Sequence, residues 1–305
     1  MILSASSRRR RLEYPTKPVR IVLDTDAKNE IDDQFTIVYA LLSQREIKVE
    51  AIHAAPFTKL GYPTPESGME ASYQEILTVL SKMSLENKPP VLRGARAMLS
   101  SIDKPLESEA ASNLIQLAMQ HRNKPLYVVA IGAITNVVSA LLIRPDIAEK
   151  ITVLWLGSQP TYWQTPKEFN LQNDPIGATV LFDSGVPLVH IPCKNVAEHV
   201  RTVPAEIEQY VRGRGVIGDY LADIFRDWIG GSKALSKVLW DITTIAYLVN
   251  PEWVPTKLQP TPRINSDMTW GVIGPGRHLC RVAVDARRDP IFLDFFRKLE
   301  GANTS

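Results

Sequence analysis

Cysteine is scarce in this 305-residue sequence, which contains only Cys193 and Cys280. Two cysteines do not make a disulfide framework, and no C-x-x-C pair is present. Cys193 lies in the apolar run VPLVHIPC, so we expect a buried free thiol. No apolar stretch reaches the length of a membrane span, and no apolar segment follows the basic N-terminal residues as in a secretory signal. These features favour a reducing cytoplasm as the location.

A surplus of one charge is also missing, since 35 Lys and Arg face 33 Asp and Glu for a net charge of +2. We therefore expect neither nucleic acid nor a membrane as a partner. The only dense basic block, Arg8 to Arg11, stands among serines in the first dozen residues. This composition is typical of a solvated segment, and we expect residues 1–16 to form a flexible N-terminal tail.

Hydrophobic residues make up 45% of the chain, enough for a substantial core. Short β-branched runs alternate with longer segments of helical spacing, which predicts an α/β fold with a doubly wound, mostly parallel (mixed) sheet and helices on both faces. The predicted strands are Val19–Asp24, Val49–Ala54, Leu126–Ile131, Ile151–Leu156 and Pro187–Ile191. The predicted helices are Gln34–Ser43, Ser72–Met83, Ala110–Gln120 and Asn136–Leu142. Residues 200–240 are predicted to be predominantly helical, and the absence of repeats and linkers favours one domain over residues 17–301.

Carboxylates crowd the end of the first predicted strand, in VRIVLDTDAKNEIDDQF. Asp24, Asp26, Asp32 and Asp33, with Glu30, fall within ten residues. Like charges raise each other's pKa, and a bound cation removes that cost. Oxygen ligands suit Ca²⁺ or Mg²⁺ better than zinc, and ligands of open α/β sheets bind beyond the carboxyl ends of strands. The alternative is a set of solvated loop and N-cap aspartates; an EF-hand does not fit, because the cluster follows a strand and lacks the required loop pattern.

The same segment resembles the signature D-x-D-P-G-x-D-D of the inosine–uridine-preferring nucleoside hydrolases. Both aspartate pairs are present, but AKNEI replaces the usual P-G-x and makes the loop two residues longer. A second segment, VVAIGAITNVVSALL, resembles the strand, glycine turn and T-N helix start of that family. The resemblance implies that the carbonyl of Ile131 completes a calcium shell. Gly132 would form the tight turn, and Thr135 or Asn136 would cap the helix.

Two later segments extend the resemblance over nearly the whole chain. KEFNLQNDPIGA is similar to the family's A-E-F-N-x-x-x-D-P-x-A-A, which implies that Glu168 and Asn170 bind ribose hydroxyls. Their alternation would point both side chains to one side of an extended segment, and Asp174 would cap the following helix. LWDITTIAYLV matches the helix that a His-Asp pair opens in the family. Asp241 would keep the metal role, whereas Trp240 replaces the histidine and can stack on a base but cannot protonate one.

The segments that contact the base in the family also differ. HAAPF stands where the family has a turn like A-G-N, and GSQPTYWQTPK stands where it has a Gly-Asn or similar contact. The residues expected to bind metal and ribose therefore resemble those of the family, whereas the residues expected to contact the base differ from them. We expect His53 to be a core or supporting histidine and the aromatic residues near Trp228 to pack within helices.

The resemblance implies a calcium-dependent hydrolase that cleaves the N-glycosidic bond of a ribonucleoside or related riboside, acting as a homodimer or homotetramer. Ca²⁺ would bind Asp26, Asp33, Asp241 and the carbonyl of Ile131, with Asp26 as general base. The longer loop leaves open whether Asp24 or Asp26 takes this role. The predicted substrate contacts are Asp32, Glu168, Asn170, Trp240 and Asp241.

Three alternatives remain. The first is a related glycoside hydrolase that acts on a substrate without a standard nucleobase. The second is a non-catalytic protein that binds a sugar or nucleoside, which the missing histidine at Trp240 motivates. The third, a haloacid-type phosphotransferase, shares D-x-D after its first strand but explains neither E-F-N nor Trp240-Asp241.

Overall fold

An eight-stranded sheet forms the centre of the molecule, in the order β3-β2-β1-β4-β5-β6-β10-β9. The computed structural model describes residues 3–120, 124–232, 234–274 and 276–302. Neighbouring strands are parallel except β10 and β9, which are antiparallel. The strands are β1 (Val19–Thr25), β2 (Ile47–Ala54), β3 (Val91–Arg93), β4 (Leu126–Ala130), β5 (Ile151–Leu156), β6 (Leu188–Ile191), β9 (Thr256–Pro260) and β10 (Leu279–Ala283). This arrangement confirms the predicted α/β class and its mostly parallel, mixed sheet.

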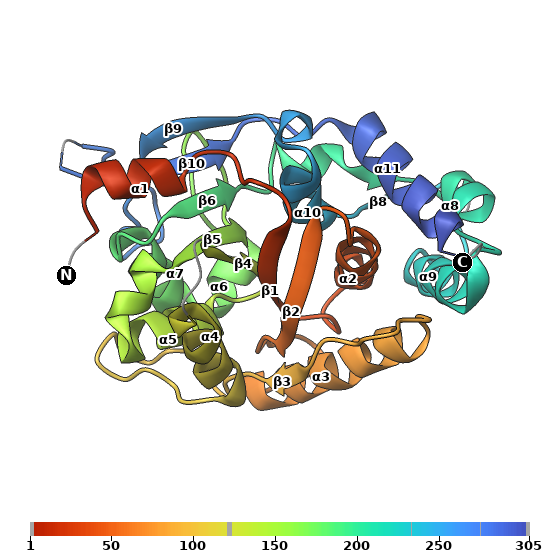
Figure 1. Ribbon diagram of the computed structural model, residues 1–305, viewed down its shortest axis with the longest axis horizontal. Coiled ribbons are helices and arrows are strands. Elements are labelled where there is room, and N and C mark those ends of the chain that lie inside the picture. The colour runs from red at the N-terminus through yellow and green to blue at the C-terminus, as the bar shows by residue number, and fades with distance from the viewer. Residues whose placement is uncertain (1–2, 121–123, 233, 275, 303–305) are drawn as a thin grey trace.

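Helices cover both faces of this sheet (Figure 1). One face carries α4 (Glu109–Met119), α5 (Thr135–Ile143) and α7 (Pro175–Asp183), which pack side by side. The other face carries α2 (Asp32–Leu42), α3 (Pro65–Ser81), α10 (Ile242–Val249) and α11 (Arg288–Gly301). The remaining elements are α1 (Ala5–Arg11), α6 (Phe169–Asn173), α8 (Pro204–Tyr210), α9 (Gly215–Trp228) and a small antiparallel pair, β7 (Arg201–Thr202) with β8 (Lys237–Val238). No helix in the described ranges is both long and apolar enough to cross a bilayer.

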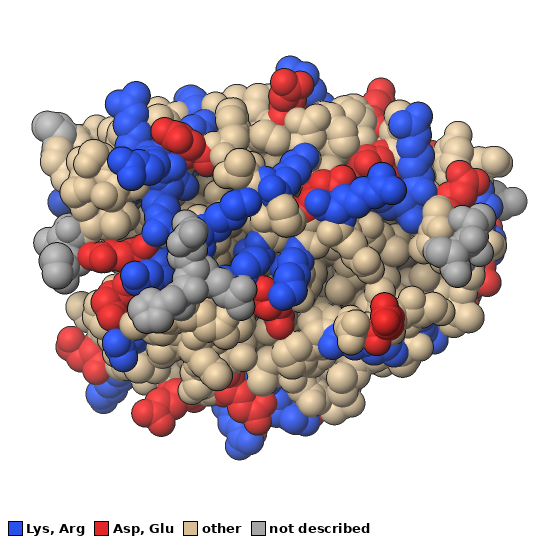
Figure 2. All heavy atoms as spheres, viewed as in Figure 1, with Lys and Arg blue, Asp and Glu red and all other residues tan. Residues whose placement is uncertain are grey.

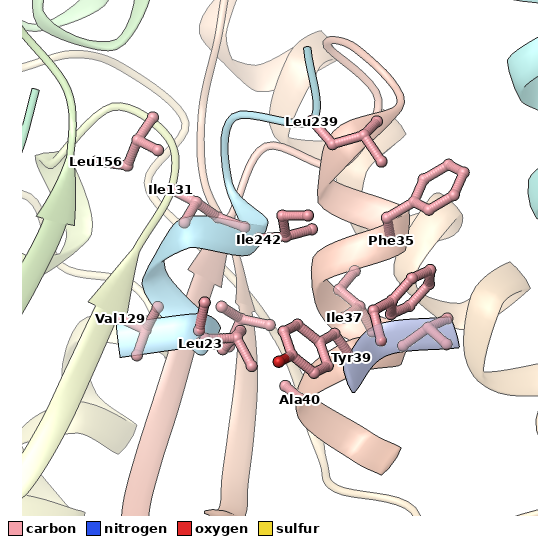
Figure 3. Packing of buried hydrophobic residues seen from close by; sticks show 14 of the residues in the cluster. Leu23, Phe35, Ile37, Tyr39, Ala40, Val129, Ile131, Leu156, Leu239 and Ile242 are labelled. Atoms are coloured by element: carbon pink, nitrogen blue, oxygen red, sulfur yellow. The ribbon is translucent and has the colours of Figure 1, made fainter. Parts of the chain in front are cut away.

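Two hydrophobic clusters lie on opposite faces of the sheet, because successive strand residues point to opposite sides. In β1, Val22 belongs to the cluster with α4, α5 and α7, and Leu23 belongs to the cluster with α2 and α10. Both residues are fully buried, which explains why the central strands are apolar without interruption. Figure 3 shows Ile242 of α10 packed among Leu23, Ile131 and Phe35. This packing fixes the start of α10 over the carboxyl ends of β1 and β4.

Most predicted elements are present, with ends that differ by a few residues. The helix predicted from Ser72 begins seven residues earlier, because Thr64 caps it with Pro65 in the first position and accepts a hydrogen bond from the backbone of Ser67. The predictions omitted β3, β9 and β10, which are short or only half-buried and carry weak strand patterns.

The N-terminal segment is more ordered than we expected from its composition. Residues Ala5–Arg11 form α1, which contacts β10. Leu12 and the stem of Arg8 are buried, and Arg8 donates a hydrogen bond of 2.7 Å from Nε to the carbonyl of Gly185. Arginine side chains can cover apolar surface while their head groups bind backbone carbonyls, so a basic run need not be solvated.

Candidate active site

A pocket of about 260 Å³ opens at the carboxyl ends of β1, β4, β5 and β6. Its lining consists of Asp26, Asn29, Glu30, Asp32, Asp33, Ile131, Leu156, Gln159, Glu168, Phe169, Asn170, Cys193, Lys194, Trp240 and Asp241. All eight site residues predicted from the sequence are among them. The carboxyl ends of parallel strands meet at one edge of a sheet, and residues distant in the sequence therefore share one pocket.

Local structure fixes the orientation of each aspartate. Asp26 follows β1, and a Cβ at Gly132 would lie 3.1 Å from the Cβ and Cγ of Asp26. Asp32 and Asp33 form the first turn of α2, where the helix dipole favours negative charge. The Thr25 hydroxyl donates a hydrogen bond to Asp33, and Asp241 directly precedes α10. A glycine, a helix start and a threonine thus hold these carboxyl groups in place.

The pocket carboxylates fit a hard divalent cation. One ligand oxygen each from Asp32, Asp33 and Asp241 lies within 4.8 Å of the others. Burial and the neighbouring carboxylates raise the pKa of Asp26, Asp33 and Asp241 well above the usual range. The Oδ2 atom of Asp26 is buried without a hydrogen-bond partner among the described residues. Because a cation removes both penalties, the donor set suits a hard divalent cation such as Ca²⁺ or Mg²⁺. The three carboxylates that lie closest together therefore include Asp32. The ligand set predicted from the sequence has Asp26 in its place.

Asp24 is fully buried behind the pocket and does not line it. Its Oδ2 accepts a hydrogen bond of 2.9 Å from Nδ2 of Asn136, whose Oδ1 accepts one from the backbone N–H of Ala95. Burial raises the pKa of Asp24 to about 7, against the effect of this hydrogen bond. Asp24 therefore supports the strand end, while Asp26 faces the pocket.

Helix α5 is not capped by Thr135 or Asn136, contrary to our expectation. Its N-cap residue is Ile134, and no side chain caps it. The hydroxyl of Thr135 instead donates to Asp174 at 2.6 Å, and Asn136 bridges Asp24 to its neighbours. Both side chains find stronger tertiary partners in buried carboxylates than the helix end offers. Asp174 itself caps α7 by accepting from the backbone of Gly177, as predicted.

Glu168 and Asn170 both line the pocket, although the segment is not extended as predicted. Glu168 is the N-cap of α6, and its carboxylate accepts backbone N–H groups of Ser158, Asn170 and Leu171 at 2.7, 2.9 and 3.3 Å. Burial nevertheless raises the pKa of Glu168 to about 7. These three hydrogen bonds fix the carboxylate at the pocket wall.

The carbonyl of Ile131, predicted to be a calcium ligand, already accepts one hydrogen bond. Asn170 donates from Nδ2 to this carbonyl at 3.3 Å and to that of Leu156 at 3.0 Å. A carbonyl oxygen has two lone pairs, and one remains for a further ligand. Asn170 thus joins the ends of β4 and β5 beneath the pocket.

The AKNEI loop (Ala27–Ile31) adds Asn29 and Glu30 to the pocket wall. The ammonium of Lys237, on β8, forms an ion pair with Glu30, lies 3.5 Å from Oδ1 of Asp32 and donates to the carbonyl of Val238 at 2.7 Å. Trp240 and Asp241 follow β8 after Leu239, so Lys237 ties the loop to the segment that carries both.

The opposite side of the AKNEI loop is held by Glu75 of α3, which is buried. Its carboxylate accepts hydrogen bonds from Lys28 at 2.8 Å and Gln34 at 3.2 Å, and also from the hydroxyl of Tyr220 on α9. The loop is therefore fixed from α3, α9 and β8, and its length does not make it a loose insertion.

Sequence reasoning missed several pocket residues. Gln159 follows β5, and Cys193 and Lys194 follow β6, so the rule that places ligands beyond the carboxyl ends of strands could have identified them. Cys193 is a buried free thiol, as predicted. His53 is buried outside the pocket lining, where its Nε2 lies 3.0 Å from Oδ1 of Asn113. Burial lowers the pKa of His53 to about 4, in agreement with a supporting role.

The aromatic candidates for base contact lie elsewhere. Tyr162 and Trp163 are exposed, and neither lines the pocket. On α9, Phe225 is buried in the core as expected, whereas Trp228 is exposed, with its ring centroid 5.3 Å from Nζ of Lys237. Trp240 and Phe169 are the aromatic residues of the described pocket lining, and Trp240 stands where we expected a histidine from the resemblance.

The model of the family described as "Inosine-uridine preferring nucleoside hydrolase" matches residues 21–290. A pyrimidine-specific ribonucleoside hydrolase RihA from Klebsiella pneumoniae (strain 342) is 28% identical over 260 residues, which cover 72% of this chain and 77% of the relative. A putative pyrimidine-specific ribonucleoside hydrolase RihB from Shigella boydii serotype 4 is 30% identical over 167 residues, which cover 52% of this chain and 69% of the relative.

Solved structures have the same fold. A plant nucleoside hydrolase, the PpNRh1 enzyme, superposes with a TM-score of 0.71 at 20% identity and covers 93% of this chain and 99% of its own. A purine-preferring ribonucleoside hydrolase from Gardnerella vaginalis gives the same TM-score, identity and coverage. The type III effector protein XopQ, solved with adenosine diphosphate ribose, gives a TM-score of 0.70 at 17% identity, with 98% of each chain covered.

Proposed function

Because this chain belongs to the inosine–uridine preferring nucleoside hydrolase family, we propose that it is a calcium-dependent hydrolase that cleaves the N-glycosidic bond of a ribonucleoside or related riboside. The observation that carries this proposal is the pocket itself, where Asp26, Asp32, Asp33 and Asp241 meet beside Glu168. Such a group of buried carboxylates is unfavourable without a cation and suited to one.

The metal would be held by Asp26, Asp33, Asp241 and the carbonyl of Ile131, with Asp32 close enough to take part. When bound, calcium supplies a positive centre that binds sugar hydroxyls and lowers the pKa of a water molecule. Because Oδ2 of Asp26 has no hydrogen-bond partner within the described chain, this oxygen is available to bind a ligand or accept a proton.

Hydrolysis proceeds as the oxygen of water bonds to the anomeric carbon and the bond from that carbon to nitrogen breaks. Asp26 accepts the proton of the water as general base. Asp32, Glu168 and Asn170 hold the ribose, and the fixed carboxylate of Glu168 needs little reorganisation to do so. The transition state carries positive charge on the sugar, which the surrounding carboxylates stabilise.

Single substitutions of the proposed metal ligands test this function. Asp26→Ala and Asp241→Ala should each abolish calcium binding in isothermal titration calorimetry and lower riboside hydrolysis by more than about 10³-fold, which is the scale of a lost general base together with a lost metal. The exposed Glu86→Gln, which removes one carboxylate outside the pocket, is the matched control. Wild-type activity in both alanine variants would contradict the proposed roles.

Trp240 favours a second candidate, a protein that binds a sugar or nucleoside without turnover. An indole at the pocket wall can stack on a ring, but it cannot protonate a leaving base. Crystals soaked with calcium and inosine or uridine distinguish the candidates when combined with product analysis in solution. Intact bound nucleoside with no released base in any riboside assay would support binding alone, whereas released base and free ribose would support hydrolysis.

A further inference from the structure

We propose that the substrate of this pocket is the riboside of a cationic, pyridinium-type heterocycle, in which a positively charged ring nitrogen bonds to the anomeric carbon. This inference rests on the proposed riboside hydrolase function and names its substrate class. It follows from two features of the leaving-group half of the pocket. The described lining contains no histidine, and its wall is aromatic and anionic.

The missing proton donor limits which leaving groups can depart. Among the described residues that line the pocket there is no histidine, and Trp240 occupies the expected position. The ammonium of Lys194 is held by Glu198 at 2.9 Å. The carboxylate of Glu168 accepts three backbone N–H groups and is assigned to the ribose, so it is not placed to protonate the leaving ring. A neutral nucleobase departs as an anion unless it is protonated, so its departure needs an acid. A pyridinium departs as a neutral ring and needs none.

The wall around Trp240 suits a cationic ring. Trp240 and Glu30 both line the pocket, and a tryptophan face attracts a cation while a carboxylate balances its charge. Lys237 binds only Oε2 of Glu30, and Oε1 makes no hydrogen bond within the described part of the chain. About 36% of the Glu30 side chain remains exposed. Glu30 is thus open to a ligand on one side while Lys237 fixes it on the other.

The charge of the whole pocket points the same way. Six carboxyl groups line it, from Asp26, Glu30, Asp32, Asp33, Glu168 and Asp241. Among the described residues of the lining, Lys194 is the one basic side chain, and Lys237 stands behind Glu30. The charge of Lys59 also acts on Glu30, Asp26 and Asp33 from outside the lining. A calcium ion and these three lysines carry five positive charges, one fewer than six ionised carboxylates, so the pocket attracts cations and disfavours an anionic leaving group.

The reaction balances without an added acid or oxidant. The bond between the anomeric carbon and the ring nitrogen breaks, and its electron pair returns to that nitrogen, which becomes neutral. The oxygen of water bonds to the anomeric carbon, and Asp26 takes the proton. The products are ribose, a neutral pyridine and one proton released to solvent.

The test compares kcat/KM for nicotinamide riboside with kcat/KM for inosine and uridine, using the full chain in calcium-containing buffer. We expect the pyridinium riboside to be hydrolysed at least tenfold more efficiently than either neutral nucleoside. Trp240→His should raise kcat/KM for inosine and narrow this ratio, because it supplies a proton donor. Glu30→Gln should raise KM for the pyridinium riboside alone. Glu86→Gln should leave kcat/KM unchanged for all three ribosides. Circular dichroism spectra and melting temperatures of each variant show whether it is folded.

A binding measurement complements the rates and does not depend on turnover. 1-Methylnicotinamide carries the cationic ring without a sugar, and nicotinamide is its neutral counterpart. Half-maximal quenching of tryptophan fluorescence should occur at a concentration of 1-methylnicotinamide at least fivefold lower than that of nicotinamide. Glu30→Gln should reduce this difference in concentration. Faster hydrolysis of inosine or uridine would overturn the pyridinium proposal and leave riboside hydrolysis intact. Failure to hydrolyse any of the three ribosides would overturn both.

Discussion

At the scale of single residues, the pocket depends on how closely other atoms approach its carboxylates. Gly132 is the clearest example, since a methyl group there would press on Asp26 and on the Cβ of Ala55 at 3.1 Å. The side chain of Asp26 is almost fully buried, so it has little room to move away. The turn after β4 therefore helps to set the position of the proposed general base.

Gly132→Ala should displace Asp26 and weaken the proposed metal site. Overpacking of a close contact costs about 1–3 kcal/mol of stability, and we expect calcium affinity and riboside hydrolysis to fall at least tenfold. Calorimetry and initial-rate assays measure the two effects. Gly274→Ala is the control, because an added Cβ there meets no atom within 4 Å. Equal losses in both variants would show that the contact with Asp26 is not the cause.

Buried histidines make stability depend on pH. Burial lowers the pKa of His53 and of His190 to about 4, so both are neutral in the folded protein near pH 7. Unfolded histidine has a pKa near 6.5 and takes up protons first as the pH falls. The contribution of these two neutral histidines to the free energy of unfolding is fully present above about pH 6.5. As the pH falls from about 6.5 to 4, each histidine lowers the free energy of unfolding by roughly 1.4 kcal/mol per pH unit.

Urea unfolding at pH 7 and pH 5 tests this prediction with His190→Gln. In the wild type, Nε2 of His190 lies 2.8 Å from Oγ of Ser158 and 2.9 Å from the carbonyl of Gly157. Glutamine offers similar hydrogen-bonding groups but does not titrate, so the variant should lose less stability between the two pH values. An unchanged pH dependence would mean that His190 does not contribute to it.

At the scale of elements, the AKNEI loop shows how contacts distant in the sequence fix one wall of the pocket. Asn29 and Glu30 line the pocket, while Lys28 is bound to Glu75 on α3. The sequence indicates the extra length but not the anchors, because Glu75 and Lys237 lie far away in the chain. Only the packing of α3, α9 and β8 around the loop brings these partners together.

Glu75→Gln should loosen this loop. It removes the charged partner of Lys28 and weakens the acceptor of Gln34 and Tyr220. Loss of a buried charged acceptor typically costs about 1–3 kcal/mol, and urea denaturation should show a decrease of this size. We also expect a higher KM for the riboside. The exposed Glu66→Gln on the same helix is the control and should change stability by less than about 0.5 kcal/mol.

The same scale explains what the sequence could and could not predict. Buried parallel strands such as Ile151–Leu156 were predicted with correct ends, because a continuous apolar run between polar turns leaves little choice. Strands β9 and β10 at one edge were missed because their exposed positions weaken the apolar pattern. The predicted site residues meet in one pocket, yet the partners of Asn136 and Glu168 are tertiary contacts that local sequence does not encode.

At the scale of the whole molecule, a net charge of +2 conceals a separation of charge. Lys and Arg gather on the face shown in Figure 2. A hollow lined by Arg10, Arg11, Arg20, Lys48 and Lys124 lies at the amino ends of β1, β2 and β4. The six carboxyl groups lie at the carboxyl ends of the strands. The field of such a molecule favours cations at the pocket.

Calcium should therefore stabilise the entire fold. A ligand that binds only the native state at 100 times its Kd adds about 2.7 kcal/mol, which corresponds to a rise in Tm of roughly 5 °C for a chain of this size. Differential scanning calorimetry with calcium and with EGTA measures the shift. Asp241→Asn, which removes one charge from the cluster, should show little or no shift. Identical melting of the wild type in both buffers would indicate that calcium does not bind.

The most direct test of metal-dependent hydrolysis is the release of free ribose from nicotinamide riboside, inosine and uridine by one enzyme preparation. The protein is assayed as prepared, after exhaustive dialysis against EGTA, and after calcium is restored. We predict ribose release from at least one riboside, its loss on chelation and its recovery with calcium. Undiminished ribose release by the EGTA-dialysed enzyme, with no metal detected in the protein, would contradict the account.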